Sequence, residues 1–366
     1  MSVELCKVTL WLEATEPGKP LSFLDHHIQC GNSLLGVTPH LLDDGLPDDA
    51  FKPIAGDDKA VCTEAKKRNK DERRQLALFH GTLAESAPWQ RLGNLPAAML
   101  EVDRIRDDTA AGLHAKEERY ADLVRSSGYL HSRFLADAWC AAFVWKKTKD
   151  HPYPITNDVL RKIECNPHDC APWMRDEIQR LREQYQFFHW QLAFPDVFPL
   201  PGKAEPAENQ RAGWKGGFDV MLGNPPWEKI HLRDEEFFAQ RHPEIAAAST
   251  KTQRKRMIGD LRLTDPSLFL EYEHERDQHE HVSAFFRLSG YFPMTGVSRI
   301  NLYSVFCETA LRLISPQGRF GLALASGLLT DENNKDIFDH IVSNSQLVLA
   351  WDFEKKRNFF GSSPQL

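Results

Sequence analysis

Apolar and polar positions divide the chain into three stretches with different periodicity. The first stretch, residues 1–44, opens with apolar residues three to four positions apart, at Leu5, Val8 and Leu12, which share one face of a predicted helix. Pro17, Gly18 and Pro20 then break the chain before Ile28–Cys30, a short β-like run that ends at Gly31-Asn32-Ser33. The expected order is therefore helix, turn, strand and loop.

The second stretch, residues 45–217, has long charged segments with the apolar spacing of helices. One apolar stripe comprises Leu135, Trp139 and Phe143, and another comprises Met174, Ile178, Leu181 and Tyr185. The stretch closes with Phe187-Phe-His-Trp-Gln-Leu-Ala-Phe-Pro195 and a loop rich in proline and glycine over 199–217. This pattern predicts a helical insertion followed by a linker.

In the third stretch, residues 218–366, strand and helix patterns alternate. The expected strands are Phe218–Leu222, Arg319–Ala325 and Gln346–Phe353, and the expected helices are Tyr303–Leu313 and Lys335–Val342, with a turn at Pro316-Gln-Gly318. Such alternation favours a mostly parallel sheet covered by helices, which places the chain in the α/β class. An unpaired edge at the Phe218 strand would invite aggregation.

Composition narrows the class of protein. The 366 residues can bury a full core, and the seven scattered cysteines form no disulfide framework. No apolar run is long enough to span a bilayer and the start lacks a signal-peptide pattern, so a cytoplasmic protein is expected. The net charge of −7 excludes a surface that is basic throughout. Any DNA contact must be local, and the basic runs 66–74 and 251–256 are either such contacts or solvated helix faces.

Gly223-Asn-Pro-Pro-Trp227 carries the most specific chemistry, because it directly follows the apolar Phe218 strand. In an open α/β sheet, ligands bind at the carboxyl ends of strands. The exocyclic amine of adenine is a poor nucleophile, since its lone pair is delocalised into the ring. The Asn224 side-chain carbonyl and the main-chain carbonyl of Pro225, held rigidly by Pro226, can accept its two hydrogens. Trp227 offers a flat face on which an extruded base would stack.

The motif has two other interpretations. Consecutive prolines also make an ordinary tight turn after a strand, but the preceding strand and the following aromatic residue favour a functional loop. Methylation of a cytosine ring carbon would need a cysteine nucleophile, and the Pro-Cys doublet expected for it does not occur.

With these motifs the sequence resembles the gamma-type N6-adenine DNA methyltransferases. The resemblance is greatest to the long, insertion-bearing enzymes of single-chain restriction-modification systems and of the BREX and DISARM phage-defence systems. It covers nearly the whole chain. Besides Asn224–Trp227, the matching segments are 3–13, 30–35, 187–190, 301–306, 321–327 and 352–354.

The resemblance implies a Rossmann-like S-adenosylmethionine-dependent methyltransferase sheet, incomplete at both ends and interrupted by the helical insertion. It implies that Asn32 and Ser33 contact the adenine ring of S-adenosylmethionine, although asparagine stands where an acid is more usual; Asn32 could equally be an ordinary turn residue. It also implies that Asn224, Pro225, Pro226 and Trp227 hold a flipped adenine of double-stranded DNA. Restriction or phage-defence subunits are the further partners expected.

Parts of the family pattern are missing. The Gly-rich loop that cradles the methionine end of the cofactor and the acid that binds its ribose have no counterpart here, so the chain is expected to begin within the domain. It is also expected to stop before the last strands and before any target-recognition domain. We therefore expect the chain as written neither to bind S-adenosylmethionine tightly nor to methylate DNA.

Three further groups of residues give weaker signals. Cys165, His168 and Cys170 lie close in sequence but have no evident fourth zinc ligand. The histidines at 26–27 and in 271–281 lack helical metal spacing and indicate a polar surface, so no metal is predicted. Asp352, Glu354 and Lys356 superficially match nuclease spacing, but belong to a predicted strand of the core.

Two competing functions stay open. One keeps methyl transfer but changes the substrate to a protein glutamine or an RNA base. The other is a non-catalytic remnant or a subunit that binds DNA or a partner through the insertion. Trp227 and the large insertion favour DNA as the substrate, whereas a failure to bind cofactor would favour the remnant.

Overall fold

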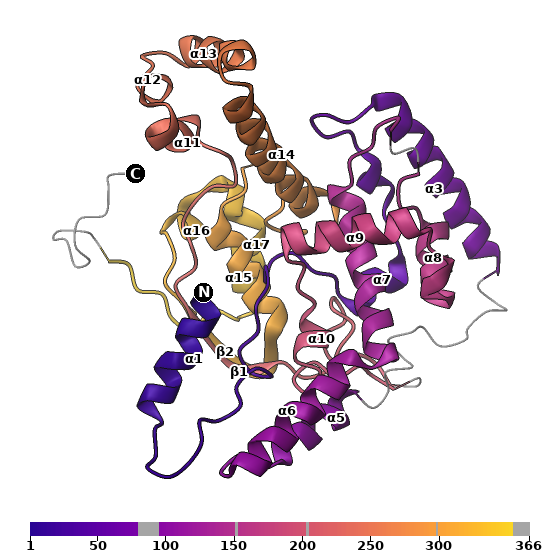
Figure 1. Ribbon diagram of the computed structural model, residues 1–366, viewed down its shortest axis with the longest axis vertical. Helices are drawn as coiled ribbons and strands as arrows, with labels where there is room; N and C mark the ends of the chain where they lie inside the picture. Colours follow the sequence, from indigo (N-terminus) through magenta and orange to yellow (C-terminus); the bar gives the residue numbers. More distant parts are fainter. Residues whose placement is uncertain (80–94, 151–152, 203–204, 298, 354–366) are drawn as a thin grey trace.

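The computed structural model describes residues 1–79, 95–150, 153–202, 205–297 and 299–353 (Figure 1). Helices predominate in this part of the chain, and β1 (Phe218–Gly223) and β2 (Ile314–Leu322) form a two-stranded parallel sheet. The helices are α1 (Ser2–Glu13), α2 (Pro39–Asp44), η1 (Asp48–Phe51), α3 (Lys59–Phe79), α5 (Leu95–Arg104), α6 (Ala110–Arg125), α7 (Ser127–Val144), α8 (Asn157–Cys165), η2 (Pro167–Asp169), α9 (Pro172–Tyr185), α10 (Trp190–Ala193), α11 (Asp234–Arg241), α12 (Pro243–Ala246), α13 (Lys251–Thr264), α14 (Pro266–Leu288), α15 (Leu302–Leu313), α16 (Gly327–Thr330), η3 (Glu332–Asn334) and α17 (Lys335–Ser343).

Helix α7 lies at the centre of the largest hydrophobic cluster. Leu135, Trp139 and Phe143 are buried on it, as their spacing predicts, and the small residues between them are buried too. Alanines on the remaining faces let neighbouring elements approach closely, so α7 packs against α8, α9 and α14. The predicted stripe of α9 is likewise buried.

The large hydrophobic cluster draws on all three stretches of the sequence. Leu34, Leu35 and Val37 come from the first stretch, α7 and α9 from the second, and Phe285–Phe292 with Val305 from the third. The division at residues 44 and 217 stays a prediction, and the three stretches share one core.

Strands β1 and β2 pair with one irregularity. Phe218 lies opposite Ile314 but Val220 lies opposite Arg319, so β2 contains extra residues between these pairs. The predicted turn at Pro316-Gln-Gly318 is therefore a bulge inside β2, which starts directly after α15. Gly318 is required there, because a Cβ would lie 2.6 Å from the carbonyl oxygen of Phe218.

Two predicted strands are wrong. Residues 28–30 form a loop. A turn precedes it, in which the amides of His27 and Ile28 donate to the carbonyl of Leu24. The β-type pairing close to this loop is a single isolated bridge between Asn32 and Phe187. Residues 346–353 are irregular, with Val348, Trp351 and Phe353 more than 70% exposed. A strand forms only where a neighbour pairs with it, and neither segment has one among the described residues.

The fold is thus mixed α/β, mostly helical, with a small parallel sheet. The Rossmann-like part of the expectation is not confirmed by these two strands. On β1 the side chains of Val220 and Leu222 are 65% and 82% exposed, and in the described chain β1 pairs on one edge alone. The apolar face predicted for α1 is also exposed at Leu5, Val8 and Leu12.

Helices α11–α13 gather at the far end of the long helix α14, away from the sheet (Figure 1). Phe237, Phe238, Ile258, Leu261 and Tyr272 form a separate hydrophobic cluster there. This helical arm follows the Asn224–Trp227 loop directly in sequence. Within the described residues, no helix has the length and apolar character needed to cross a membrane.

Candidate active site

The loop Asn224–Trp227 begins where β1 ends, as predicted. Asn224, Pro226 and Trp227 are exposed and Pro225 is buried. The carboxamide of Asn224 makes no hydrogen bond to any described residue, so its donor and acceptor atoms are available to a ligand. The buried Pro225 anchors the loop while its neighbours face outward.

Trp227 is fixed at one edge of its ring. Its indole Nε1 donates to the main-chain carbonyl of Ala323 at 3.2 Å, and the side chain is 51% exposed. Ala323 continues from β2, and its own amide donates to the carbonyl of Gly223 at 3.0 Å. The tryptophan is thereby oriented at the carboxyl end of the two-stranded sheet while half of its surface stays open.

The chain after the loop is held by a second strand-like pairing. The amide of Leu302 donates to the carbonyl of Glu228 at 2.9 Å, and Lys229 and Asn301 form an isolated antiparallel bridge. This pairing connects the loop to the start of α15.

A buried polar network supports this connection. The hydroxyl of Tyr303 accepts from the side-chain amides of Asn301, at 3.2 Å, and Asn334, at 3.3 Å. Ser304 donates to Asn334 at 2.6 Å. Asn334 was not predicted from the sequence, because it reaches α15 from 30 residues away.

The second candidate segment, Gly31–Gly36, is a tight loop. The side-chain oxygen of Asn32 accepts from the amide of Leu34 at 3.2 Å, which makes Asn32 a turn residue. Its main-chain amide donates to the carbonyl of Gln186 at 2.7 Å, whereas its side-chain nitrogen Nδ2 has no partner among the described residues. Both Asn32 and Ser33 are partly exposed. The turn and ligand interpretations of Asn32 are thus compatible.

Residues 186–191 pack against this loop and hold it in place; we call this segment the brace. Phe188 donates its amide to the carbonyl of Leu35 at 2.7 Å, and the indole of Trp190 donates to the carbonyl of Ser33 at 3.1 Å. A Cβ on Gly31 would lie 2.5 Å from the ring of Phe188, and one on Gly36 would lie 2.0 Å from its carbonyl oxygen. Glycine is therefore needed at both ends of the loop for this close approach.

The same brace reaches the start of β1. The ring of Trp190 packs edge-on against Phe218, with centroids 6.0 Å apart. Segments 31–36 and 186–191 and strand β1 are therefore one packed unit. The Gly31–Gly36 loop and the Asn224–Trp227 loop are related to each other through this packing.

A comparison with protein-family models decides what kind of protein has these two segments. Residues 1–257 match the model of the Eco57I restriction-modification methylase. The chain belongs to the Eco57I restriction-modification methylase family. The matched region includes both the Gly31–Gly36 loop and Asn224–Trp227. No curated protein and no solved structure matches the chain.

Membership of this family makes the protein a DNA methyltransferase of a restriction-modification system. Enzymes of the Eco57I family typically use S-adenosylmethionine as the methyl donor. Segments 301–306, 321–327 and 352–354 also resemble the gamma-type methyltransferases. They lie beyond the matched region, so their resemblance stays a prediction.

Four cysteines of this Eco57I-family methylase are buried and poorly placed to act as nucleophiles. Cys62, Cys140, Cys170 and Cys307 are buried, and burial raises the pKa of the Cys62 thiol to about 11 and that of Cys307 to about 12. Cys165 is exposed and Cys170 is buried, and in the described chain they do not converge with His168 on a metal position.

Each of the two basic runs combines paired side chains with exposed ones. On α3, Arg68 pairs with Glu72 at 2.7 Å, Arg73 with Asp48 and Arg74 with Asp71. On α13, Arg254 is buried and donates to the carbonyls of Ile245, Ala246 and Ala248. Lys251, Lys255 and Arg256 remain exposed on the helical arm. Of the nuclease-like residues, Glu354 and Lys356 lie outside the described residues.

Proposed function

We propose that this methylase transfers the methyl group of S-adenosylmethionine to the N6 amine of adenine in DNA, as gamma-type enzymes do. The observation that carries the proposal is the exposed, unpartnered carboxamide of Asn224 at the end of β1, beside the half-exposed and tethered ring of Trp227. Restriction or phage-defence subunits of the BREX or DISARM kind are the partners that the sequence resemblance implies.

The chemistry follows from two acceptors. The side-chain oxygen of Asn224 and the main-chain oxygen of Pro225 accept the two hydrogens of the amine, which draws its lone pair out of conjugation with the ring. The face of Trp227 stacks on the extruded base and keeps water from one side of it. The amine attacks the methyl group directly, so no covalent enzyme intermediate is required.

The residues on the Gly31–Gly36 loop fit the adenine end of the cofactor. The side-chain amide of Asn32, which has no partner among the described residues, would donate to a ring nitrogen of the cofactor's adenine while its oxygen accepts from the Leu34 amide. The cofactor supplies an electrophilic methyl group. Holding donor and acceptor at near-attack distance is then the main task of the protein.

The test measures methylated nucleosides in genomic DNA from cells that carry the full native gene. Asn224→Ala removes one acceptor and should lower N6-methyladenine formation on the order of a hundredfold. Gln75→Ala, which truncates an exposed amide on α3, is the matched control and should leave methylation unchanged.

Four results would contradict the proposal. Near-normal methylation by Asn224→Ala would remove the role of its carboxamide. Product found as N4-methylcytosine would change the target base, and product confined to RNA or protein glutamine would change the substrate class. No methylation by the unaltered protein would favour a partner-binding subunit.

A further inference from the structure

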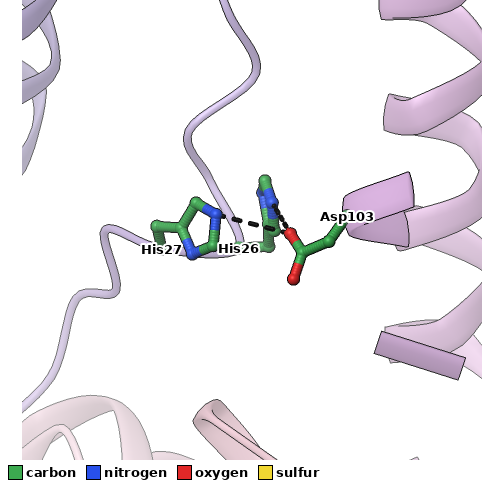
Figure 2. Close-up of side chains that lie close together, drawn as sticks. All are labelled: His26, His27 and Asp103. Carbon is green, nitrogen blue, oxygen red and sulfur yellow. Dashed lines mark hydrogen bonds and ion pairs between the residues drawn. The ribbon is translucent and has the colours of Figure 1, made fainter. Parts of the chain in front are cut away.

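Two adjacent histidines and one aspartate converge outside the candidate active site. His26 and His27 lie in the loop before Cys30, and Asp103 lies in the last turn of α5 (Figure 2). The Nε2 atoms of His26 and His27 lie 2.8 Å and 3.4 Å from the same oxygen, Oδ1 of Asp103. The three potential ligand atoms all lie within 4.8 Å of one another.

The arrangement is built rather than incidental. The His26 side chain is 1% exposed and its ring stacks on Phe23, with centroids 5.3 Å apart. Its Nδ1 is buried without a hydrogen-bond partner among the described residues. The burial and the stacking fix the ring so that Nε2 points at the Asp103 carboxylate.

The other two ligand side chains leave the group open to solvent. His27 is 55% and Asp103 30% exposed. An ion could therefore enter from solvent and keep a water molecule as a further ligand. The sequence interpretation of the histidines at 26–27 as polar surface is thus wrong for His26 and right for His27.

We propose that His26, His27 and Asp103 bind a divalent transition-metal ion of the zinc class. Two imidazoles and one carboxylate are a ligand set that zinc accepts, with water in the fourth position. Tetrahedral zinc with bonds of about 2.0–2.1 Å holds neighbouring ligand atoms roughly 3.3 Å apart. The His27–Asp103 separation already has this value, and the His26–Asp103 separation needs to open by about half an ångström.

Neighbouring charges do not oppose the ion strongly. Lys116 is the nearby cation, and its ammonium lies 3.6 Å from the carboxylate of Asp107. Lys7 is paired with Asp25 at 2.6 Å. The three ligands thus keep one negative charge, that of Asp103, for the ion.

The ion would fasten the loop 23–29 to the α5–α6 pair. Two weaker ties already join them: the amide of Phe23 donates to Asp107 at 3.1 Å, and Gln29 donates to the hydroxyl of Tyr120 at 2.8 Å. A metal bond there would add stability to the folded state, because the unfolded chain does not hold the three ligands together. This role is independent of the proposed methyl transfer.

The experiment titrates the metal-free protein with Zn²⁺ by calorimetry and records the absorption spectrum with Co²⁺. We expect one saturable equivalent, imidazole and oxygen ligation of cobalt, and a melting temperature that rises with Zn²⁺. His27→Gln, at a position that is 55% exposed, should weaken Zn²⁺ binding at least about tenfold, and Asp103→Asn should do the same.

His114→Gln is the matched control. His114 is exposed on α6 between the carboxylates of Glu117 and Glu118, and its loss should leave the affinity unchanged. The proposal is overturned by the absence of saturable binding, by wild-type affinity in both ligand variants, or by a thiolate-to-cobalt band that assigns the ion to cysteines.

Discussion

The indole of Trp227 is hydrogen-bonded to the carbonyl of Ala323, 96 residues later in the chain. This bond ties the loop after β1 to the end of β2 and orients an aromatic ring whose face stays accessible. A stacking platform for a base needs both properties, a fixed plane and an open side. The side chain thus contributes an aromatic face for stacking and a hydrogen-bond donor. A phenylalanine at position 227 would keep the face and lose the donor, so it separates the two contributions.

Trp227→Ala should therefore weaken catalysis more than Trp227→Phe. Removal of the ring costs about 1–3 kcal/mol of stacking on the target base, whereas phenylalanine loses mainly the bond to Ala323. Methyl-transfer rates of the full native protein on its own DNA site measure the difference. Equal losses in both variants would mean that Trp227 acts by packing alone.

Trp190→Phe should lower cofactor affinity and leave the maximal rate nearly unchanged. The indole of Trp190 holds the carbonyl of Ser33 in the Gly31–Gly36 loop, and a lost hydrogen bond of this kind costs about 1 kcal/mol, or roughly fivefold in affinity. The KM for S-adenosylmethionine and kcat are measured separately. Trp173→Phe changes a half-exposed tryptophan on α9 and should alter neither value; a fall in kcat alone for Trp190→Phe would contradict the assigned role.

Gly36→Ala should destabilise the fold, and Gly259→Ala should not. A Cβ at Gly36 would lie 2.0 Å from the carbonyl oxygen of Phe188, so the loop and its brace must separate, at a cost of about 1–3 kcal/mol or more. Gly259 lies within α13 with nothing within 4 Å of an added Cβ, and alanine there should stabilise the helix by about 0.5–1 kcal/mol. Denaturant unfolding of both variants tests the contrast, and equal stabilities would refute the close approach.

Glu308 should make stability fall as pH rises. Burial raises the pKa of its carboxyl above the ordinary 4.5, although Thr295 donates to it through its amide and its hydroxyl. The folded state therefore binds the proton more tightly than the unfolded chain. The stabilisation is present below pH 4.5 and is lost as pH rises through the raised folded pKa.

Glu308→Gln removes this titration, so its unfolding free energy should decline less than that of the unaltered protein over the same pH interval. The slopes are compared rather than the absolute stabilities, because glutamine also loses an acceptor for the amide of Met294. Parallel profiles would show that the carboxyl titrates alike in both states.

Local periodicity predicted the helices well, because one apolar face in register suffices to define a helix. The stripes of α7 and α9 are buried as expected, and α15 and α17 begin and end within one residue of their predicted limits. The segments 28–30 and 346–353 have the composition of strands, but a strand also needs a partner, which local sequence does not specify. Arg254 shows the same limit, since a basic run gives no sign that one member caps a neighbouring helix.

The same limit applies to the candidate site: its local features could be predicted from the sequence, and its long-range contacts could not. The order of strand, Asn224, two prolines and Trp227 is local, so the exposed loop at the end of β1 could be predicted. The contacts from Trp190 to Ser33, across 157 residues, and from Trp227 to Ala323 depend on tertiary packing. The convergence of His26 and His27 with Asp103, 77 residues from His26, has no signature in sequence spacing.

The shared hydrophobic cluster around α7 bears on how such proteins can be recombined. Leu34, Leu35 and Val37 pack with α7 and with Phe285–Phe292, so residues before and after the insertion complete its core. The predicted insertion, residues 45–217, therefore shares its core with both flanking stretches and is not a detachable module. Exchanging residues 45–217 between two members of the family would bring together surfaces selected for different neighbours, and a working hybrid would have to carry the matching residues of both flanking stretches with it.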